Sequence, residues 1–93
     1  MTDYVVEAYL SMARAGELER AAARAREAAR ELTETGVPVR HLRSVFLPSE
    51  ETCFHFFEAP SEGTVREVLT RAGLDFDRIG PVVTAEAGKG GME

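Results

Sequence analysis

An apolar stripe at helical spacing, set between strand-like segments, constrains the fold of this chain most. The stripe consists of Leu18, Ala21, Ala22, Ala25, Ala28, Ala29 and Leu32, which recur on one face of an α-helix. Alanine has the highest helix propensity, and its small side chain lets a helix lie close against a sheet. Gly36 and Pro38 predict the end of this helix, because glycine favours the left-handed residue after a helix and proline prevents continuation.

Segments rich in β-branched and aromatic residues predict four strands around this helix. They cover residues 3–10, 39–47, 52–59 and 79–86. A second apolar stripe of Val65, Val68, Leu69 and Ala72 predicts a shorter helix between an N-cap at Ser61 and a terminator at Gly73. Gly80 and Pro81 weaken the last strand and favour an edge position for it.

The order of these elements is that of the ferredoxin-like βαββαβ sandwich, an α+β fold. Right-handed crossovers place the strands in a four-stranded antiparallel sheet of order 4-1-3-2, with two helices on one face. We expect a single ferredoxin-like domain over residues 1–87 and a flexible, glycine-rich C-terminal tail over residues 88–93. The other sheet face is left open, and we expect a homodimer that covers it.

Composition excludes several classes of partner. Eleven Lys and Arg against sixteen Asp and Glu give the 93 residues a formal net charge of -5, which disfavours a nucleic-acid backbone. No apolar run approaches the roughly 20 residues that cross a bilayer, and the acidic start does not resemble a signal peptide. A single cysteine agrees with a reducing compartment. We therefore expect a cytoplasmic protein that binds neither nucleic acid nor membrane.

Both histidines and the only cysteine fall in the predicted hairpin of residues 39–59. His41 lies on its first strand, and Cys53 and His55 lie on its second. Imidazole and thiolate ligands suit nickel, zinc and copper. Because Cys53 and His55 are two residues apart on a strand, their side chains point the same way, with Cα atoms roughly 6.5 to 7 Å apart. They are the primary metal-ligand candidates.

Two ligands are too few for one ion, so the site needs further donors. Glu7, Tyr9 and Glu58 are the expected oxygen donors, and a symmetry mate is another source of ligands. The hairpin register decides whether His41 also contributes. An even loop over residues 48–51 pairs Ser44 with the second histidine and turns His41 to the opposite face, whereas a slip of one residue brings His41 to the face of the other two candidates.

Other functions also fit these residues. A dimer enclosing an apolar cavity lined by Phe54, Phe56, Tyr9 and His41 would suit a cofactor-free enzyme of the monooxygenase or isomerase type, or a ligand-binding module. That hypothesis is based on fold analogy alone. No nucleophile, base and orienting group follow from spacing, so the catalytic residues are unknown and an enzyme is the less favoured interpretation. A structural or regulatory dimer without a small ligand is a third possibility.

The chain also resembles a known family over nearly its whole length, up to about Val83. The similarity is carried by residues 7–10 (EAYL), 37–44, 51–52, 54, 57–61, 71–74 (RAGL) and 76–79 (FDRI). The family comprises small ferredoxin-like proteins of unknown function and includes an actinobacterial nickel-binding protein. The resemblance implies the ferredoxin-like fold, a homodimer and nickel binding, with no established reaction. We therefore predict a dimeric metal-binding protein that prefers nickel and serves in storage, sensing or delivery.

Overall fold

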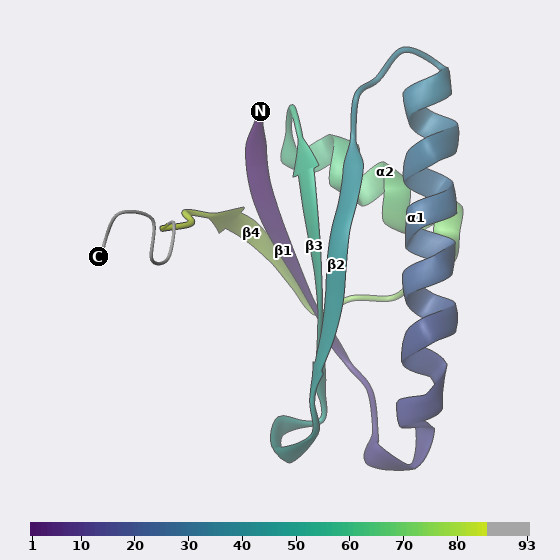
Figure 1. Ribbon diagram of the computed structural model, residues 1–93, viewed down its shortest axis with the longest axis vertical. Helices are drawn as coiled ribbons and strands as arrows, with labels where there is room; N and C mark the ends of the chain where they lie inside the picture. Colours follow the sequence, from purple (N-terminus) through teal and green to yellow (C-terminus); the bar gives the residue numbers. More distant parts are fainter. Residues whose placement is uncertain (86–93) are drawn as a thin grey trace, which may run out of the picture.

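The computed structural model describes residues 1–85, and its elements follow the predicted order. The strands are β1 (Thr2–Tyr9), β2 (Arg40–Leu47), β3 (Thr52–Ala59) and β4 (Arg78–Val82), and the helices are α1 (Leu18–Glu34) and α2 (Glu62–Ala72). The strands form one antiparallel sheet of order β2-β3-β1-β4, which is the predicted order read from the other edge. Both helices lie on the same side of the sheet (Figure 1). The ferredoxin-like α+β fold is thereby confirmed.

The residues predicted to begin and end α2 do so in the structure. The Ser61 hydroxyl accepts a hydrogen bond from the Thr64 amide at 3.2 Å and caps α2. Gly73, with φ of 68°, takes the left-handed conformation directly after that helix. One element was not predicted, a 3₁₀ segment over Met12–Glu17 that leads into α1. Its six residues are too few to give a helical apolar pattern, and none of them is buried.

The last strand is shorter than predicted. It ends at Val82 rather than at residue 86, because its partner β1 begins at Thr2 and the ladder runs out after Asp3 pairs with Val82. Val83 is 98% exposed. β4 does occupy an edge of the sheet, as Gly80 and Pro81 predicted. The predicted end of this strand at residue 86 and the predicted tail, residues 88–93, lie outside the described residues.

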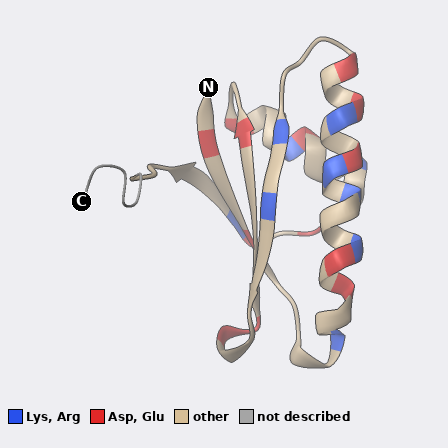
Figure 2. Cartoon of the chain, viewed as in Figure 1, with Lys and Arg blue, Asp and Glu red and all other residues tan. Residues whose placement is uncertain are grey.

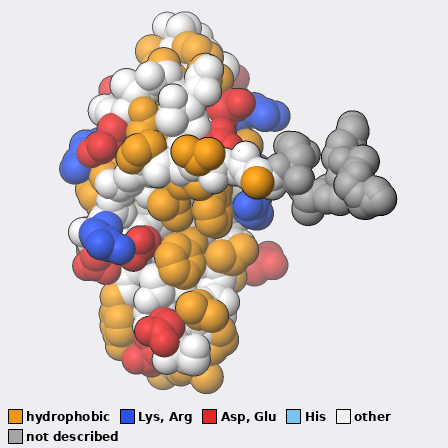
Figure 3. Space-filling view, turned by 90° about the vertical axis from the view of Figure 1, so that its left-hand side faces the viewer, with side chains coloured by type: hydrophobic (Ala, Val, Ile, Leu, Met, Phe, Trp, Pro, Cys, Tyr) orange, Lys and Arg blue, Asp and Glu red, His pale blue; other side chains and the backbone are white. Residues whose placement is uncertain are grey.

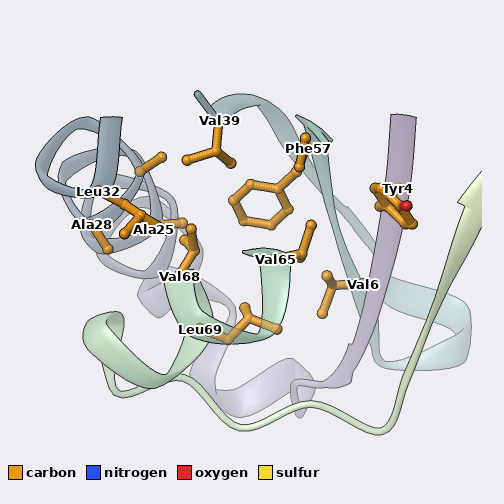
Figure 4. Close-up of a cluster of buried hydrophobic side chains, with 12 residues drawn as sticks. Tyr4, Val6, Ala25, Ala28, Leu32, Val39, Phe57, Val65, Val68 and Leu69 are labelled. Atoms are coloured by element: carbon orange, nitrogen blue, oxygen red, sulfur yellow. The ribbon is translucent and has the colours of Figure 1, made fainter. Parts of the chain in front are cut away.

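The core fills the space between the sheet and the two helices, with Phe57 near its centre (Figure 4). Alanines of the predicted α1 stripe pack against it, as do valines and a leucine of α2. The fully buried side chains of largest volume are Phe57, Leu69, Val6, Val65 and Val68. Charged residues recur along α1 and are also present on the strands, the β2–β3 turn and α2 (Figure 2). Over residues 1–85, neither helix has the length and hydropathy required to cross a membrane.

The strand β3 divides its residues between two environments. Cys53, His55 and Phe57 point toward the helices and are buried, whereas Phe54 and Phe56 point away and are half-buried. Apolar side chains gather on the face of the sheet turned away from the helices, with charged side chains around them (Figure 3). The candidate ligands of the hairpin therefore lie on the helix-covered face, not on the open one.

Candidate functional site

A β-bulge in β2 brings His41 to the helix-covered face. The ladder keeps the even register, with Ser44 opposite His55, as far as Arg43. It then shifts at Leu42, which is the extra residue, and moves His41 onto the face of Ser44 and His55. Neither of the two registers considered from the sequence holds along the whole strand. The even register is confirmed from Arg43 to the turn, and the residues before Arg43, including His41, are displaced by one position.

Four side chains on this face form a chain of contacts. Cys53 Sγ lies 3.4 Å from His55 Nε2, His55 Nδ1 lies 2.6 Å from Ser44 Oγ, and Ser44 Oγ lies 2.9 Å from His41 Nε2. A serine hydroxyl has one proton, so it donates to one imidazole and accepts from the other. The protons therefore run either from the thiol toward His41 or in the opposite direction. Both arrangements leave the two imidazoles uncharged.

Burial keeps the two histidines and the cysteine of this contact chain neutral. Burial, together with the nearby His41, lowers the pKa of His55 to about 4. The pKa of His41 is also lowered, first by burial and then by the charge of Arg26. Burial raises the pKa of the Cys53 thiol. At neutral pH these side chains are thus two uncharged imidazoles and a protonated thiol. A metal ion must therefore displace the proton of the Cys53 thiol to gain a thiolate ligand.

A cavity of about 260 Å³ opens beside Cys53, at one end of this row of side-chain contacts. Cys53 and His55 both line it, although each is only 3% exposed. The other walls come from the end of β1, from α1 and its preceding 3₁₀ segment, and from the loop after α2. A second cavity of about 410 Å³ is lined by His41 and Ser44 on the other side of α1. The contact chain therefore links two cavities.

Cys53 and His55 fit two ligands of one soft or borderline ion. With metal–sulfur and metal–nitrogen bonds of about 2.3 and 2.05 Å, two ligand atoms are about 3.1 Å apart at a right angle and about 3.5 Å apart at the tetrahedral angle. The observed 3.4 Å between Sγ and Nε2 lies within that interval. Across residues 1–85, however, no three His, Cys, Asp or Glu side chains cluster closely enough to hold an ion together.

Two of the three predicted oxygen donors lie on the opposite face of the sheet. Glu7 pairs with Arg78 at 3.1 Å, and Glu58 pairs with Arg40 at 3.1 Å. Tyr9 lies two positions after Glu7 on β1, and the residue is 65% exposed. The structure therefore brings the two histidines and the cysteine together, and it separates Glu7 and Glu58 from them by the thickness of the sheet. Tyr9, at the end of β1, is among the residues that line the cavity beside Cys53 and His55.

The apolar cavity expected for an enzyme does not assemble from its four residues within one chain. Phe54 and Phe56 point to the open face, while the bulge turns His41 to the helix-covered face. His41 instead packs edge-on against Phe57, with ring centroids 5.4 Å apart. Its other aromatic neighbour is His55, at 6.3 Å.

Sequence reasoning missed the charged rim of the smaller cavity. It consists of Arg14, Glu17, Arg20, Arg24 and Asp75. No function was predicted from the sequence for the arginines of α1. The i,i+4 spacing of Arg20 and Arg24 was the available signal, because it places both side chains on one side of α1. Their proximity to the cysteine depends on how α1 packs on the sheet.

Comparisons with known proteins agree with this architecture. The crystal structure of SCO4226 from Streptomyces coelicolor A3(2) matches with a TM-score of 0.70, covering 90% of this chain and 99% of that chain at 20% sequence identity, which supports the fold alone. No curated protein matches the sequence. The family model described as nickel responsive protein SCO4226-like matches residues 4–82. The chain therefore belongs to the SCO4226-like family of nickel responsive proteins.

Proposed function

We propose that this protein binds a divalent metal ion, nickel by preference, through Cys53 and His55, and that it serves in nickel storage, sensing or delivery. The 3.4 Å approach of Cys53 Sγ to His55 Nε2 beside a cavity carries the proposal. The description of the family as nickel responsive supports the choice of metal. Zinc and copper share the preference for thiolate and imidazole ligands, so they are the metals against which nickel must be compared.

Ser44 and His41 would support the ligands rather than bind the ion. A histidine that binds metal through Nε2 carries its proton on Nδ1, and that proton needs an acceptor. Ser44 Oγ lies 2.6 Å from His55 Nδ1 and can accept it, while donating its own proton to His41 Nε2 at 2.9 Å. Metal binding would thus select one of the two proton arrangements of the contact chain. His41, predicted as a ligand, takes this supporting role.

We propose further that the protein is a homodimer formed through the open sheet face. Apolar side chains are exposed there in a soluble fold, including Val45 at 41% and Leu47 at 44%. Phe54 and Phe56 lie beside them on β3. A contiguous apolar patch of this kind is typical of an interaction surface. In this arrangement the partner covers the face opposite the metal site, and a reduced thiol at that site is consistent with a cytoplasmic protein.

Calorimetric titration of the apo-protein with nickel chloride and with zinc chloride tests the metal site. We expect nickel to bind with a Kd well below about 1 mM, and Cys53→Ala or His55→Gln to weaken binding by at least about tenfold. Glu58→Gln, on the opposite face, is the matched control and should leave the affinity unchanged. Circular dichroism checks that each variant folds. Binding no tighter than millimolar, or insensitivity to both ligand substitutions, would refute the proposal.

A cofactor-free enzyme is the second candidate, favoured by one observation. Ser44 Oγ lies within hydrogen-bonding distance of two imidazole nitrogens, as a nucleophile lies beside its base. The residue that orients the base would be Cys53, a thiol rather than a carboxylate. Labelling of Ser44 by a serine-directed fluorophosphonate probe tests this candidate, with Ser49 of the β2–β3 turn as an internal control. If Ser44 is not labelled selectively, its contacts with the two imidazoles no longer support an enzyme.

A further inference from the structure

The cavity beside Cys53 offers fewer protein ligands than a nickel ion requires. Ni²⁺ takes tetragonal or octahedral coordination, with at least four ligands. The described chain supplies two soft donors there, and no third His, Cys, Asp or Glu side chain joins them among residues 1–85. The cavity measures about 260 Å³, which is enough for a small molecule as well as an ion. The remaining ligands can therefore come from a molecule that enters with the metal.

The rim of this cavity is more basic than the protein as a whole. Three guanidinium groups and two carboxylates line it, in a chain whose formal net charge is -5. Arg14 is paired with Glu17 through two hydrogen bonds of 2.7 and 3.0 Å. The Arg24 guanidinium donates to the carbonyls of Ala72 and Gly73, both at 3.1 Å. These bonds hold the Arg24 charge in place at the end of α2.

Arg20 differs from the other two arginines of the rim. Over residues 1–85 its guanidinium makes neither a hydrogen bond nor an ion pair, and it lies one helical turn before Arg24 on α1. Asp75 provides the only rim carboxylate besides the one already paired with Arg14. A bare divalent cation meets net positive charge at this entrance, whereas an anion is attracted to it. Guanidinium groups are also well shaped to bind carboxylates.

We infer that the cavity takes its metal as an anionic complex with a small polycarboxylate chelator. Cys53 and His55 would bind the ion, while Arg20, supported by Arg24, pairs with a carboxylate of the chelator. The chelator supplies the ligands that the chain lacks and reverses the sign of the charge that approaches the rim. This inference depends on the proposed metal site and identifies the form in which the metal reaches it.

Equilibrium dialysis of the full chain against nickel and radiolabelled citrate tests the inference, since it measures both components. We expect nickel-dependent retention of about one citrate per metal site. Arg20→Gln should weaken citrate retention by about tenfold or more. Arg66→Gln removes the same charge from α2, where the side chain does not line this cavity, and should have no effect. Circular dichroism verifies folding of both variants.

The other outcomes separate the inference from the metal site itself. Bound nickel that carries no citrate, although citrate is present in excess, would overturn the inference and leave the Cys53 and His55 site intact. Citrate retained without nickel, or retained equally by Arg20→Gln, would also overturn it, because the chelator would then bind independently of the metal or at another place. Failure of nickel to bind in either form would refute the proposed function.

Discussion

In the middle of the β2–β3 hairpin, several side chains reverse the usual distribution between the two faces of a sheet. In an antiparallel sheet with one covered face, apolar residues normally face the core and polar residues face solvent. Here the helix-covered face buries a chain of polar groups, and the open face presents apolar ones. The polar chain consists of His41, Ser44, Cys53 and His55, and the apolar set of Val45, Leu47, Phe54 and Phe56.

This reversal bears on the proposed metal site and on the proposed dimer interface. Buried polar groups cost free energy unless they are hydrogen-bonded, and within residues 1–85 every buried side-chain nitrogen or oxygen has a partner. Apolar side chains at the same positions would need no such network. The buried polar chain is therefore consistent with the proposed metal site, and the half-buried phenylalanines are consistent with the proposed dimer interface.

The largest expected effect distinguishes two adjacent phenylalanines of β3. Phe57→Ala empties the centre of the core and should lower the free energy of unfolding by about 3–5 kcal/mol, since Phe57 is fully buried. Phe56→Ala should lower it by less than about 1 kcal/mol when measured at protein concentrations too low for association. Urea denaturation followed by circular dichroism measures both values. Equal losses would mean that the two faces do not differ as described.

Acid should destabilise the fold through His55. Its pKa in the folded protein is lowered to about 4, while an unfolded histidine titrates near 6.5, so the unfolded chain binds more protons between these values. The stability contribution is complete above pH 6.5 and is lost as the pH falls toward 4, by about 3 kcal/mol. Urea denaturation at several pH values measures this loss.

His55→Gln provides the control for the acid effect, because ordinary carboxylates begin to titrate at the acidic end of this range. The difference between the two proteins isolates the histidine. If the wild-type protein and the variant lose stability in parallel between pH 6.5 and 4, His55 is not held neutral by burial.

A charge on the open face should separate the proposed dimer. Burial of one phenylalanine contributes about 1.5–3 kcal/mol, and a two-fold axis doubles the loss, so Phe56→Glu should weaken association by at least about a hundredfold. Ala23→Glu adds the same charge to the outer surface of α1 and should leave the mass unchanged. Sedimentation equilibrium measures the mass of each protein. A monomeric wild-type protein would contradict the proposed interface.

The smallest effect concerns a side chain that does not touch the metal. Ser44→Ala removes the acceptor for the His55 Nδ1 proton and should weaken nickel binding by about 10- to 100-fold. Ser44→Thr retains the hydroxyl and should restore most of the affinity. Nitrogen NMR of the His55 ring in the nickel-free variants reports which nitrogen carries the proton. Unchanged affinity in Ser44→Ala would mean that the contact chain does not support the ligand.

Most of the fold could be predicted because its signals are local. The apolar stripes, the Ser61 cap and the glycine after each helix depend on neighbours within a few residues, and the pairing of Ser44 with His55 followed from counting across a short turn. The end of β4 could not be predicted in this way, since it depends on where β1 begins.

The site was less predictable because its decisive feature is a bulge. Nothing in the residues around Leu42 distinguishes a regular strand from one with an extra residue. The bulge determines that His41 packs against Phe57 and contacts Ser44, and these contacts exist only in the folded chain. Whether Cys53 and His55 lie on the covered or the open face of the sheet also depends on which side the two helices cover. Glu7 and Glu58, two of the predicted oxygen donors, consequently lie on the opposite face of the sheet from Cys53 and His55.

Anomalous diffraction from crystals grown with nickel tests most directly the claim that the metal binds on the helix-covered face. We predict an anomalous peak about 2.0–2.3 Å from both Cys53 Sγ and His55 Nε2, facing the cavity beside α1. A nickel peak instead at Glu7 or Glu58, with none between the cysteine and the histidine, would place the metal on the open face and contradict this account.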